Sequence, residues 1–355
     1  MHRRLALKAC AFGLLPAPLM SLADPTRPHA YDDPRLHLIG RFQREGEDSV
    51  RFAWSGSALA FGFRGTRVSI PLSDSGQNRF LLEVDGAQRI LTAGAEARQL
   101  VLAENLPAGE HRVRLTRITE AMLGESVFTG PPVSDGEWLV TPRRVRRLLV
   151  IGDSITAGYG VEGANENCGF SPQTENQQLS YAAVAANALD AELHSLAWSG
   201  KGVYRNYGEA RPQGPNMSTL HRRVLPARAG SAWQDADYSP HAIIVNLGSN
   251  DFWNGAPAAG HYDEAMAALV EDLARTHDAV PIYLMASPLL AGSTRAAQVR
   301  ALERLCAERG RTLLLDIERV REDEGWGCDF HPGRATHARQ GAELARRLRA
   351  DLGWA

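Results

Sequence analysis

The distribution of apolar and polar residues divides the chain into two parts with different periods. Between residues 36 and 128, short segments alternate apolar and polar side chains, a period of two that is typical of strands buried on one face. Turn-forming residues separate these segments, and Asp85-Gly86 fits a tight hairpin turn. The segments are residues 49–54, 57–63, 66–72, 79–84, 89–93, 98–103 and 111–118. We therefore expect an all-β, jelly-roll-like sandwich domain over residues 30–135.

After Pro142 the pattern changes to apolar strands that alternate with amphipathic helices. The expected strands are residues 146–152, 191–197, 241–248, 281–287 and 311–317, and the expected helices are 181–191, 262–277, 294–309 and 335–352. Strands that are apolar throughout and connected by helices are typical of a parallel sheet covered on both faces. We expect an α/β domain over residues 143–355, with its ligand site at the carboxyl ends of the strands.

The first residues have the pattern of an export signal. Three positive charges precede a short apolar stretch at residues 9–20, and small residues precede a cleavage site after Ala23. We therefore expect residues 1–23 to be a signal peptide and the mature protein to be periplasmic or extracellular. The pair Arg3-Arg4 leaves both the general secretory route and the twin-arginine route open.

Composition and charge exclude several classes of protein. The 355 residues are 44% hydrophobic and 23% charged, with a formal net charge of −2. Proteins that neutralise a nucleic-acid backbone carry basic faces, so we expect no nucleic-acid partner. The apolar stretches beyond the signal are too short to span a membrane. The four cysteines form no Cys-x-x-Cys pair and no zinc-finger spacing, so we expect no structural zinc site. We also expect a monomer.

The first α/β strand ends in Gly-Asp-Ser, which places Ser154 at the carboxyl edge of the sheet. One alternative is that Asp153 or Ser154 only caps the following helix. A second alternative is a dinucleotide loop, because residues 158–163 read Gly-x-Gly-x-x-Gly, but these glycines lie too far beyond the strand. The chain has no Walker loop and no Gly-x-Ser-x-Gly elbow. Ser154 is therefore a candidate nucleophile.

Three further strand ends supply groups that acyl transfer needs. Gly200 and Asn250 follow the second and third strands, so their N–H groups and the backbone N–H of Ser154 can form an oxyanion hole. His331 follows the fifth strand and is the candidate general base. If its segment is extended, Asp329 points to the same side and can orient the ring. We therefore predict a serine esterase in which Ser154, Asp329 and His331 are catalytic.

Other residues near these motifs allow more than one interpretation. Asn250 and Asp251 also fit a turn that caps a helix, and we expect Asp251 to support the loop rather than to react. His337 is a rival base, but it falls in the last helical pattern, where we expect it on the surface. Aromatic residues near the motif loops usually pack in the core. Among them we select Trp253 and Trp326 as candidate walls of a sugar-binding site.

The ordered motifs Gly-Asp-Ser, Gly, Gly-x-Asn-Asp and a C-terminal Asp/His resemble the blocks of the SGNH (GDSL-type) hydrolases. With a sandwich before the hydrolase domain, the chain is similar to carbohydrate esterase family 2, and the stretches that carry this similarity are GDSITAGYG, CGFSPQTENQQLSYAA, WSGKGVYRNYG, NLGSNDF and GCDFHP. This resemblance implies a flavodoxin-like sheet and the removal of acetyl groups from xylan, mannan or glucan-type polysaccharides, without metal or cofactor. The usual Asp lies three residues before the His, where this chain has Cys328. The resemblance therefore leaves open whether Asp329 or a backbone carbonyl orients His331.

Two other functions are compatible with the same residues. One is a different SGNH activity, such as that of a peptidoglycan O-acetylesterase, a lysophospholipase or a thioesterase. No long apolar segment that could hold a lipid chain is evident, which disfavours a lipid substrate. The other is a carbohydrate-binding protein with a vestigial site, although the set of Ser, Gly, Asn and His is intact.

The proposed mechanism also predicts a disulfide between Cys168 and Cys328. Cys168 lies in the loop beyond Ser154, and Cys328 lies three residues before His331. If the serine and the histidine meet, the two sulfur atoms reach the same rim of the site, and an oxidising compartment lets them pair. The alternative is two reduced cysteines that lie close together.

Overall fold

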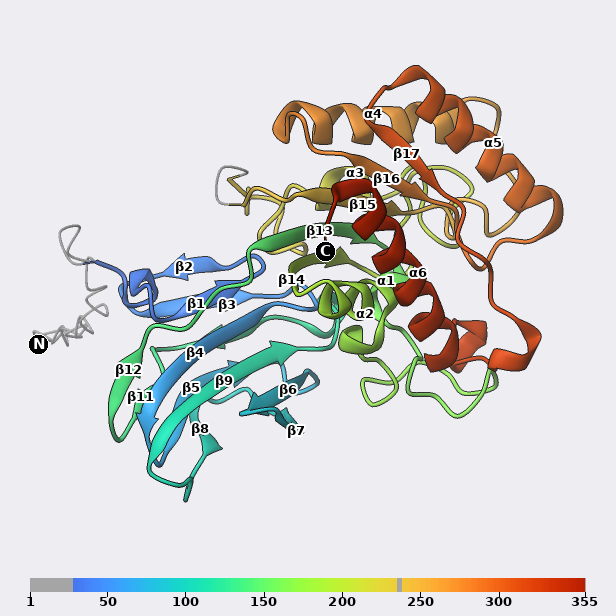
Figure 1. The fold of residues 1–355 in the computed structure, drawn as a ribbon. Coiled ribbons are helices and arrows are strands. Elements are labelled where there is room, and N and C mark those ends of the chain that lie inside the picture. Colours follow the sequence, from blue (N-terminus) through green and yellow to red (C-terminus); the bar gives the residue numbers. More distant parts are fainter. Residues whose placement is uncertain (1–27, 235–237, 355) are drawn as a thin grey trace, which may run out of the picture.

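The computed structural model describes residues 28–234 and 238–354, so the expected signal peptide at residues 1–23 lies outside it. Over the described residues the chain forms two antiparallel sheets and then one parallel sheet with helices, which confirms the predicted fold class. Figure 1 shows the β-sandwich beside the α/β unit. None of the helices in the described ranges has the length and apolar character of a membrane span. The domain limits 30–135 and 143–355 stay predictions.

The sandwich consists of two six-stranded sheets within the described residues. One has the order β1 (His37–Ile39), β4 (Ala58–Gly65), β9 (Gly109–Arg117), β6 (Arg79–Val84), β7 (Ala87–Thr92), with β12 (Glu137–Leu139) also on β4. The other has the order β11 (Val133–Ser134), β5 (Val68–Asp74), β10 (Ser126–Phe128), β3 (Ser49–Phe52), β2 (Gln43–Glu45), with β8 (Arg98–Ala103) also on β5.

The alternating pattern that predicts these strands also explains their packing. In β5, Val68, Ile70 and Leu72 are buried in the core between the sheets, and the residues between them are half-buried. The predicted hairpin is confirmed, because Val84 pairs with Ala87 across Asp85-Gly86, both of which have positive φ. A period of two therefore locates the long strands, whereas the short strands β1, β2 and β10 to β12 carry too few residues to show it.

The parallel sheet has the order β14 (Ala191–Ala197), β13 (Arg146–Gly152), β15 (Ala242–Asn246), β16 (Ile282–Met285), β17 (Thr312–Leu315). This flavodoxin-like order places β13 at the topological switch point, where ligands of open α/β sheets bind. The α-helices are α1 (Ser154–Ala157), α2 (Tyr181–Ala188), α3 (Met217–Leu220), α4 (His261–Thr276), α5 (Gly292–Glu308) and α6 (Arg334–Leu352). Short 3-10 turns are η1 (Ala30–Asp32), η2 (Ala121–Leu123), η3 (Gln177–Leu179), η5 (Glu322–Glu324) and η6 (Cys328–Phe330).

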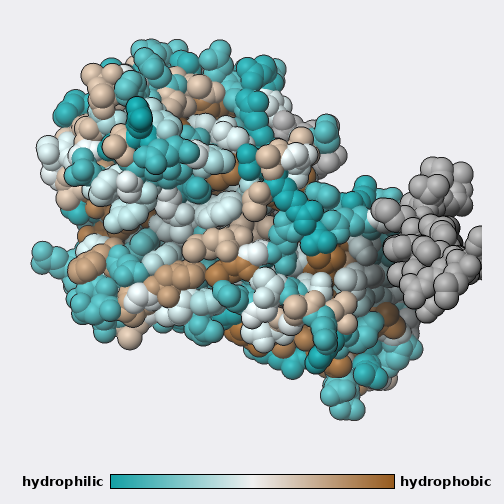
Figure 2. Space-filling model, turned by 180° about the vertical axis from the view of Figure 1, so that it is seen from behind, coloured by the Kyte–Doolittle hydropathy of each residue, from teal (hydrophilic) through white to brown (hydrophobic). Residues whose placement is uncertain are grey.

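Helices cover both faces of the parallel sheet, as the apolar strands predict. Leu148 and Val150 of β13 belong to a core with α2 and α6, whereas Leu149 and Ile151 belong to a core with α4 and α5. Both faces of β13 are thus buried, which explains why its residues 148–151 are all apolar. From behind, the molecule shows a largely hydrophilic surface with hydrophobic residues in small groups (Figure 2).

The sandwich and the α/β unit are packed tightly against each other. Trp54, which follows β3, is buried in the core of the α/β unit, and its indole N–H donates to the carbonyl of Arg223 over 3.1 Å. A second contact joins His37 of β1 to Glu192 of β14 at 2.6 Å. Side chains of the sandwich therefore reach the strands and loops that carry the candidate site.

Candidate active site

Ser154 lies at the first turn after β13, where the chain turns sharply. A Cβ on Gly152 would approach Thr156 Oγ1 to 2.0 Å, so the turn requires glycine. Asp153 is the N-cap of α1, and its carboxylate accepts a hydrogen bond from the N–H of Ile155 at 3.0 Å. Burial raises the pKa of Asp153 to about 7. The capping interpretation thus applies to Asp153, and Ser154 is left to face a cavity.

The side chains of Ser154 and His331 meet although 177 residues separate them in sequence. Ser154 Oγ lies 2.8 Å from Nε2 of His331. Burial lowers the pKa of His331, although hydrogen bonds to the carbonyls of Asp329 and Cys328 oppose this shift. A neutral imidazole at this distance can accept the proton of the serine hydroxyl.

The carboxylate of Asp329 does not orient the ring as we expected. Nδ1 of His331 lies 3.1 Å from the carbonyl oxygen of Asp329 and 3.2 Å from that of Cys328. The expectation required an extended segment, but Asp329 and Phe330 have φ values of +51° and +56° in the turn η6. The turn brings the carbonyl to the ring and lets the Asp329 carboxylate accept a hydrogen bond from the hydroxyl of Tyr159 at 2.5 Å. Of the two orienting groups left open by the sequence, the backbone carbonyl is the one in contact.

Tyr159 is a site residue that the sequence interpretation missed. Its ring stacks on the imidazole of His331, with centroids 4.1 Å apart and an angle of 29° between the planes. The ring of Phe170 packs against the ring of Tyr159, with centroids 4.9 Å apart. Burial and the bond to Asp329 raise the pKa of the Tyr159 hydroxyl, so it stays a donor. The stretch GDSITAGYG contains this tyrosine, but no pattern in it reveals the distant partner.

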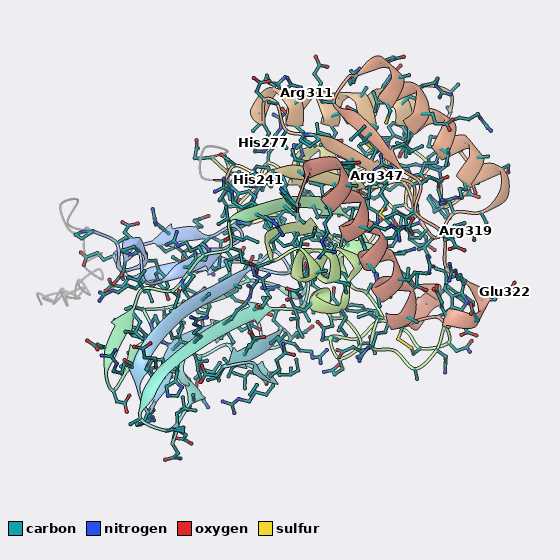
Figure 3. All side chains as sticks on the ribbon, viewed as in Figure 1. His241, His277, Arg311, Arg319, Glu322 and Arg347 are labelled. Carbon is teal, nitrogen blue, oxygen red and sulfur yellow. A yellow bond between two sulfur atoms is a disulfide. The ribbon has the colours of Figure 1, made fainter. Side chains whose placement is uncertain are left out.

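A disulfide ties the His331 segment to the loop that follows the serine. Cys168 and Cys328 form an S–S bond of 2.10 Å across 160 residues, and Cys306 is free. The backbone N–H of Cys328 also donates to the carbonyl of Gly160 at 3.1 Å. A Cβ on Gly163 would lie 2.4 Å from the sulfur of Cys328, so the two segments are in close contact. In Figure 3 the labels Arg319 and Glu322 mark the path from β17 toward this segment.

The expected oxyanion donors lie on the loops after β14 and β15. Gly200 adopts a φ of +77°, a conformation that favours glycine. Asn250 is buried, and its Nδ2 donates to the carbonyl of Lys201 at 2.9 Å and lies 3.4 Å from Asp153 Oδ2. Because Ser154 begins α1, its backbone N–H has no intrahelical partner. These groups lie around the cavity that Ser154 faces.

Asp251 supports this region as expected and stays away from the serine. Its carboxylate accepts hydrogen bonds from the backbone N–H groups of Val203, Tyr204 and Arg205, at 2.7 to 3.1 Å. A Cβ on Gly202 would come within 2.6 Å of Asp251 Oδ2, so the loop packs directly on the carboxylate. Asp251 thereby fixes the loop that continues from Gly200.

One cavity of about 740 Å³ contains most of the predicted site residues. Its lining includes the predicted Ser154, Gly200, Asn250, Trp253, Trp326, Asp329 and His331, together with Tyr159, Ser199, Tyr207 and Phe330. The indole of Trp253 is 40% exposed and packs against Tyr207 with ring centroids 5.3 Å apart. Phe330, which precedes the base His331, is 60% exposed, and its ring packs against that of Trp326 with centroids 6.2 Å apart. Aromatic side chains therefore line the cavity both on the loops after β14 and β15 and on the segment that carries His331.

His337, the rival base, is buried, so the expectation that it lies on the surface is wrong. Its Nδ1 accepts a hydrogen bond from the backbone N–H of Tyr181 at 3.1 Å, which joins α6 to the start of α2. Burial lowers the pKa of His337 to about 3. The helical period predicts the helix correctly, but His337 lies on its inner face, and it does not line the cavity.

Comparison with known proteins agrees with this geometry. Residues 150–339 match the GDSL-like Lipase/Acylhydrolase family. Fold and site thus define a GDSL-type (SGNH) hydrolase. Residues 38–142 match the Carbohydrate esterase 2 N-terminal family. The chain belongs to carbohydrate esterase family 2, which confirms the resemblance found in the sequence.

Three relatives illustrate the similarity. Cellulase/esterase CelE of Acetivibrio thermocellus is 32% identical over 330 residues, which are 91% of this chain but only 40% of that protein. An acetylxylan esterase / glucomannan deacetylase of Cellvibrio japonicus is 26% identical over 344 residues, 94% of each chain. The structure of a family two carbohydrate esterase from Clostridium thermocellum in complex with cellohexaose has a TM-score of 0.86 and 30% identity, and covers 90% of this chain and 100% of that one.

Proposed function

We propose that this chain is an exported serine esterase that removes O-acetyl groups from carbohydrate through an acyl-enzyme on Ser154. The observation that carries the proposal is the contact of 2.8 Å between Ser154 Oγ and His331 Nε2. The contact lies in a cavity that also contains Gly200 and Asn250. A nucleophile, a base and nearby donors for a developing oxyanion are the groups that acyl transfer requires.

The proposed reaction uses His331 twice. In the first step Ser154 Oγ attacks the acetyl carbonyl carbon while Nε2 of His331 takes the hydroxyl proton. The tetrahedral oxyanion accepts hydrogen bonds from the N–H groups of Ser154 and Gly200 and from Nδ2 of Asn250, which exchanges its long contact of 3.4 Å with Asp153 for the oxyanion and keeps its bond to Lys201. The intermediate collapses, the sugar oxygen leaves with the proton from His331, and acetyl-Ser154 remains. Water then attacks this ester, again with His331 as base, and acetate leaves as the proton returns to Ser154.

The orientation of His331 is proposed to come from backbone carbonyls rather than from a carboxylate. The carbonyl oxygens of Cys328 and Asp329 accept from Nδ1–H, which selects the tautomer with a free lone pair on Nε2. Tyr159 holds the plane of the ring by stacking. A neutral acceptor stabilises the imidazolium less than a carboxylate does, so stacking on an electron-rich face contributes to that state.

The proposed substrates are acetylated xylan, mannan or glucan-type polysaccharides and their oligosaccharides. Flat aromatic rings offer the apolar surface on which sugar rings stack, and Trp253 and Trp326 border the cavity. The relatives support this class, since one is described as an acetylxylan esterase / glucomannan deacetylase and another binds cellohexaose. Tyr207 and Phe330 extend the aromatic surface.

Export is proposed on two grounds. The sequence at residues 1–23 has the pattern of a signal peptide. The bond between Cys168 and Cys328 persists in an oxidising compartment and is rare in the cytosol. We further propose a monomer that acts without metal or cofactor.

The experiment that tests the substrate follows acetate release by NMR on acetylated xylan, mannan and glucan, and assigns the position that loses its acetyl group. We expect release from at least one polymer by the wild type and none by Ser154→Ala. Turnover only of acetylated peptidoglycan, a lysophospholipid or a thioester would contradict the carbohydrate assignment. Binding of the polymers without turnover would indicate a vestigial site.

A further inference from the structure

Glu120 belongs to the sandwich, yet its side chain ends beside the candidate oxyanion hole. It follows β9 and precedes η2, and it is fully buried. One carboxylate oxygen accepts from the backbone N–H of Ser199 at 2.6 Å, and the other accepts from the Ser199 hydroxyl at 2.5 Å. The carboxylate of Glu120 therefore accepts hydrogen bonds from both the backbone N–H and the hydroxyl of Ser199. Ser199 precedes Gly200, whose N–H is a proposed donor to the oxyanion.

These two bonds control the direction of the Gly200 N–H. That N–H belongs to the planar peptide unit that joins Ser199 and Gly200. Its direction is therefore set by the backbone of Ser199, which the two bonds fix. On the other side, the N–H of Tyr207 donates to the carbonyl of Gly200 at 2.8 Å. Gly200 is thus held through Ser199, which Glu120 of the sandwich contacts, and through its own carbonyl, which Tyr207 contacts.

The surroundings of Glu120 hold its carboxylate in place. Arg117, fully buried, donates to the backbone carbonyls of Thr119, Glu120 and Gly124 and so fixes the segment that carries Glu120. The backbone N–H of Glu120 donates to the carboxylate of Glu175 at 3.2 Å. Burial raises the pKa of both carboxyl groups, and the charge of Glu120 raises that of Glu175 further, whereas the bonds from Ser199 and the charge of Arg117 oppose the shift at Glu120.

The sandwich also holds the loop on the other side of the serine. The carbonyl of Ile118 accepts from the N–H of Gln177 at 2.9 Å. Arg79 of β6 donates to the carbonyls of residues 172, 173 and 175 and to the carboxylate of Glu162. The end of β9 and its continuation therefore contact both loops that flank the cavity, although no sandwich residue lines the cavity itself.

We propose that Glu120 is a positioning residue for the esterase reaction: through its two bonds to Ser199 it aims the Gly200 N–H at the oxyanion, and it makes the β-sandwich a working part of the catalytic centre. This inference rests on the proposed function. Preorganised donors stabilise a transition state only when their direction is already set. Loss of the carboxylate is therefore expected to act on the chemical step more than on substrate binding.

The test compares Glu120→Gln with a matched variant, Glu125→Gln. Glu125 also joins the sandwich to the α/β unit, because its carboxylate accepts hydrogen bonds from Arg228 at 2.6 and 2.8 Å. It does not contact the loop that carries Ser199 and Gly200. With a small acetyl ester, Glu120→Gln is expected to lower kcat by about ten- to a hundredfold, with KM changed by less than about threefold. Glu125→Gln is expected to keep kcat within about twofold of the wild type.

Ser199→Ala provides a second variant that keeps the buried carboxylate and the N–H bond. It is expected to lower kcat by about threefold or more, and the double variant with Glu120→Gln is expected to lose less than the product of the two single effects, because both act on one contact. This variant also tests the proposal if Glu120→Gln does not fold.

Three results would overturn the inference: a kcat for folded Glu120→Gln within about twofold of the wild type, an effect confined to KM, or independent effects of the two substitutions. The wild type and Ser154→Ala are measured in the same assay. If Ser154→Ala abolishes hydrolysis and Glu120→Gln does not lower it, only the role of Glu120 fails. If the wild type does not hydrolyse the ester, the proposed function fails, and this inference fails with it.

Discussion

The carbonyl oxygen of Asp329 lies 3.1 Å from Nδ1 of His331, while the carboxylate of the same residue accepts a hydrogen bond from the hydroxyl of Tyr159. The residue that would complete a conventional triad therefore acts on the ring through its backbone. Its carboxylate does not contact the ring. It accepts a hydrogen bond from Tyr159, and the ring of Tyr159 stacks on the imidazole of His331.

This relationship predicts different effects for two substitutions. Asp329→Asn keeps the backbone carbonyl and an oxygen that can accept from Tyr159, so kcat/KM on a small acetyl ester should stay within about tenfold of the wild type. His331→Ala removes the base and should lower kcat/KM by several orders of magnitude. If both variants lose activity equally, the carboxylate is needed after all, and a full triad operates.

The lowered pKa of His331 predicts activity at mildly acidic pH. Burial shifts this pKa below its ordinary value of 6.5, so the ring stays neutral, and able to accept a proton, at pH values where an exposed histidine is already half protonated. The acid limb of the kcat/KM profile should therefore have its midpoint below pH 6.5. NMR titration of the His331 ring, assigned by its absence from His331→Ala, separates it from Asp153, whose pKa lies at about 7. A ring midpoint at or above pH 6.5 would contradict the assignment.

The disulfide predicts the thiol content of the mature protein. Without residues 1–23 the chain has Cys168, Cys306 and Cys328, so titration of denatured, unreduced protein should find one free thiol. Closing a loop of this length stabilises the fold by at most about 5 kcal/mol in the chain-entropy model. Cys328→Ser should therefore lower both Tm and kcat, whereas Cys306→Ser should leave kcat unchanged. Three free thiols would rule the bond out.

Asn250 is expected to act on the transition state. Asn250→Ala should lower kcat by about a hundred- to a thousandfold with little change in KM, because its donor matters most when charge develops on the acetyl oxygen. Steady-state kinetics on a small ester separates the two parameters. A rise in KM at constant kcat would instead make Asn250 a substrate-binding residue.

The sequence predicts the long elements of the fold well because their burial is periodic. The strands of the parallel sheet begin and end within two residues of their expected limits, since both faces of the sheet are covered and apolar residues predominate along its strands. The helical period also finds α4 to α6. It does not reveal which face of α6 is innermost, and for that reason His337 was expected on the surface although it is buried.

The site is only partly predictable for a different reason. The motifs predict which residue types gather at the carboxyl edge, because strand ends of a parallel sheet meet there. The left-handed backbone of Asp329 and Phe330 gives no signal, since neither residue is glycine, and it reverses the roles of carbonyl and carboxylate. The contact from Glu120 depends on how the sandwich packs against the α/β unit, and no local pattern encodes that.

The central claim is that Ser154 carries the acetyl group during turnover. The direct measurement is mass spectrometry of protein quenched in acid within the first turnovers on an activated acetyl ester, followed by peptide mapping. We expect the mass increment of one acetyl group on the peptide that contains Ser154, and neither increment nor turnover in Ser154→Ala. An acetyl group on a different residue, or turnover by Ser154→Ala within about tenfold of the wild type, would contradict the account.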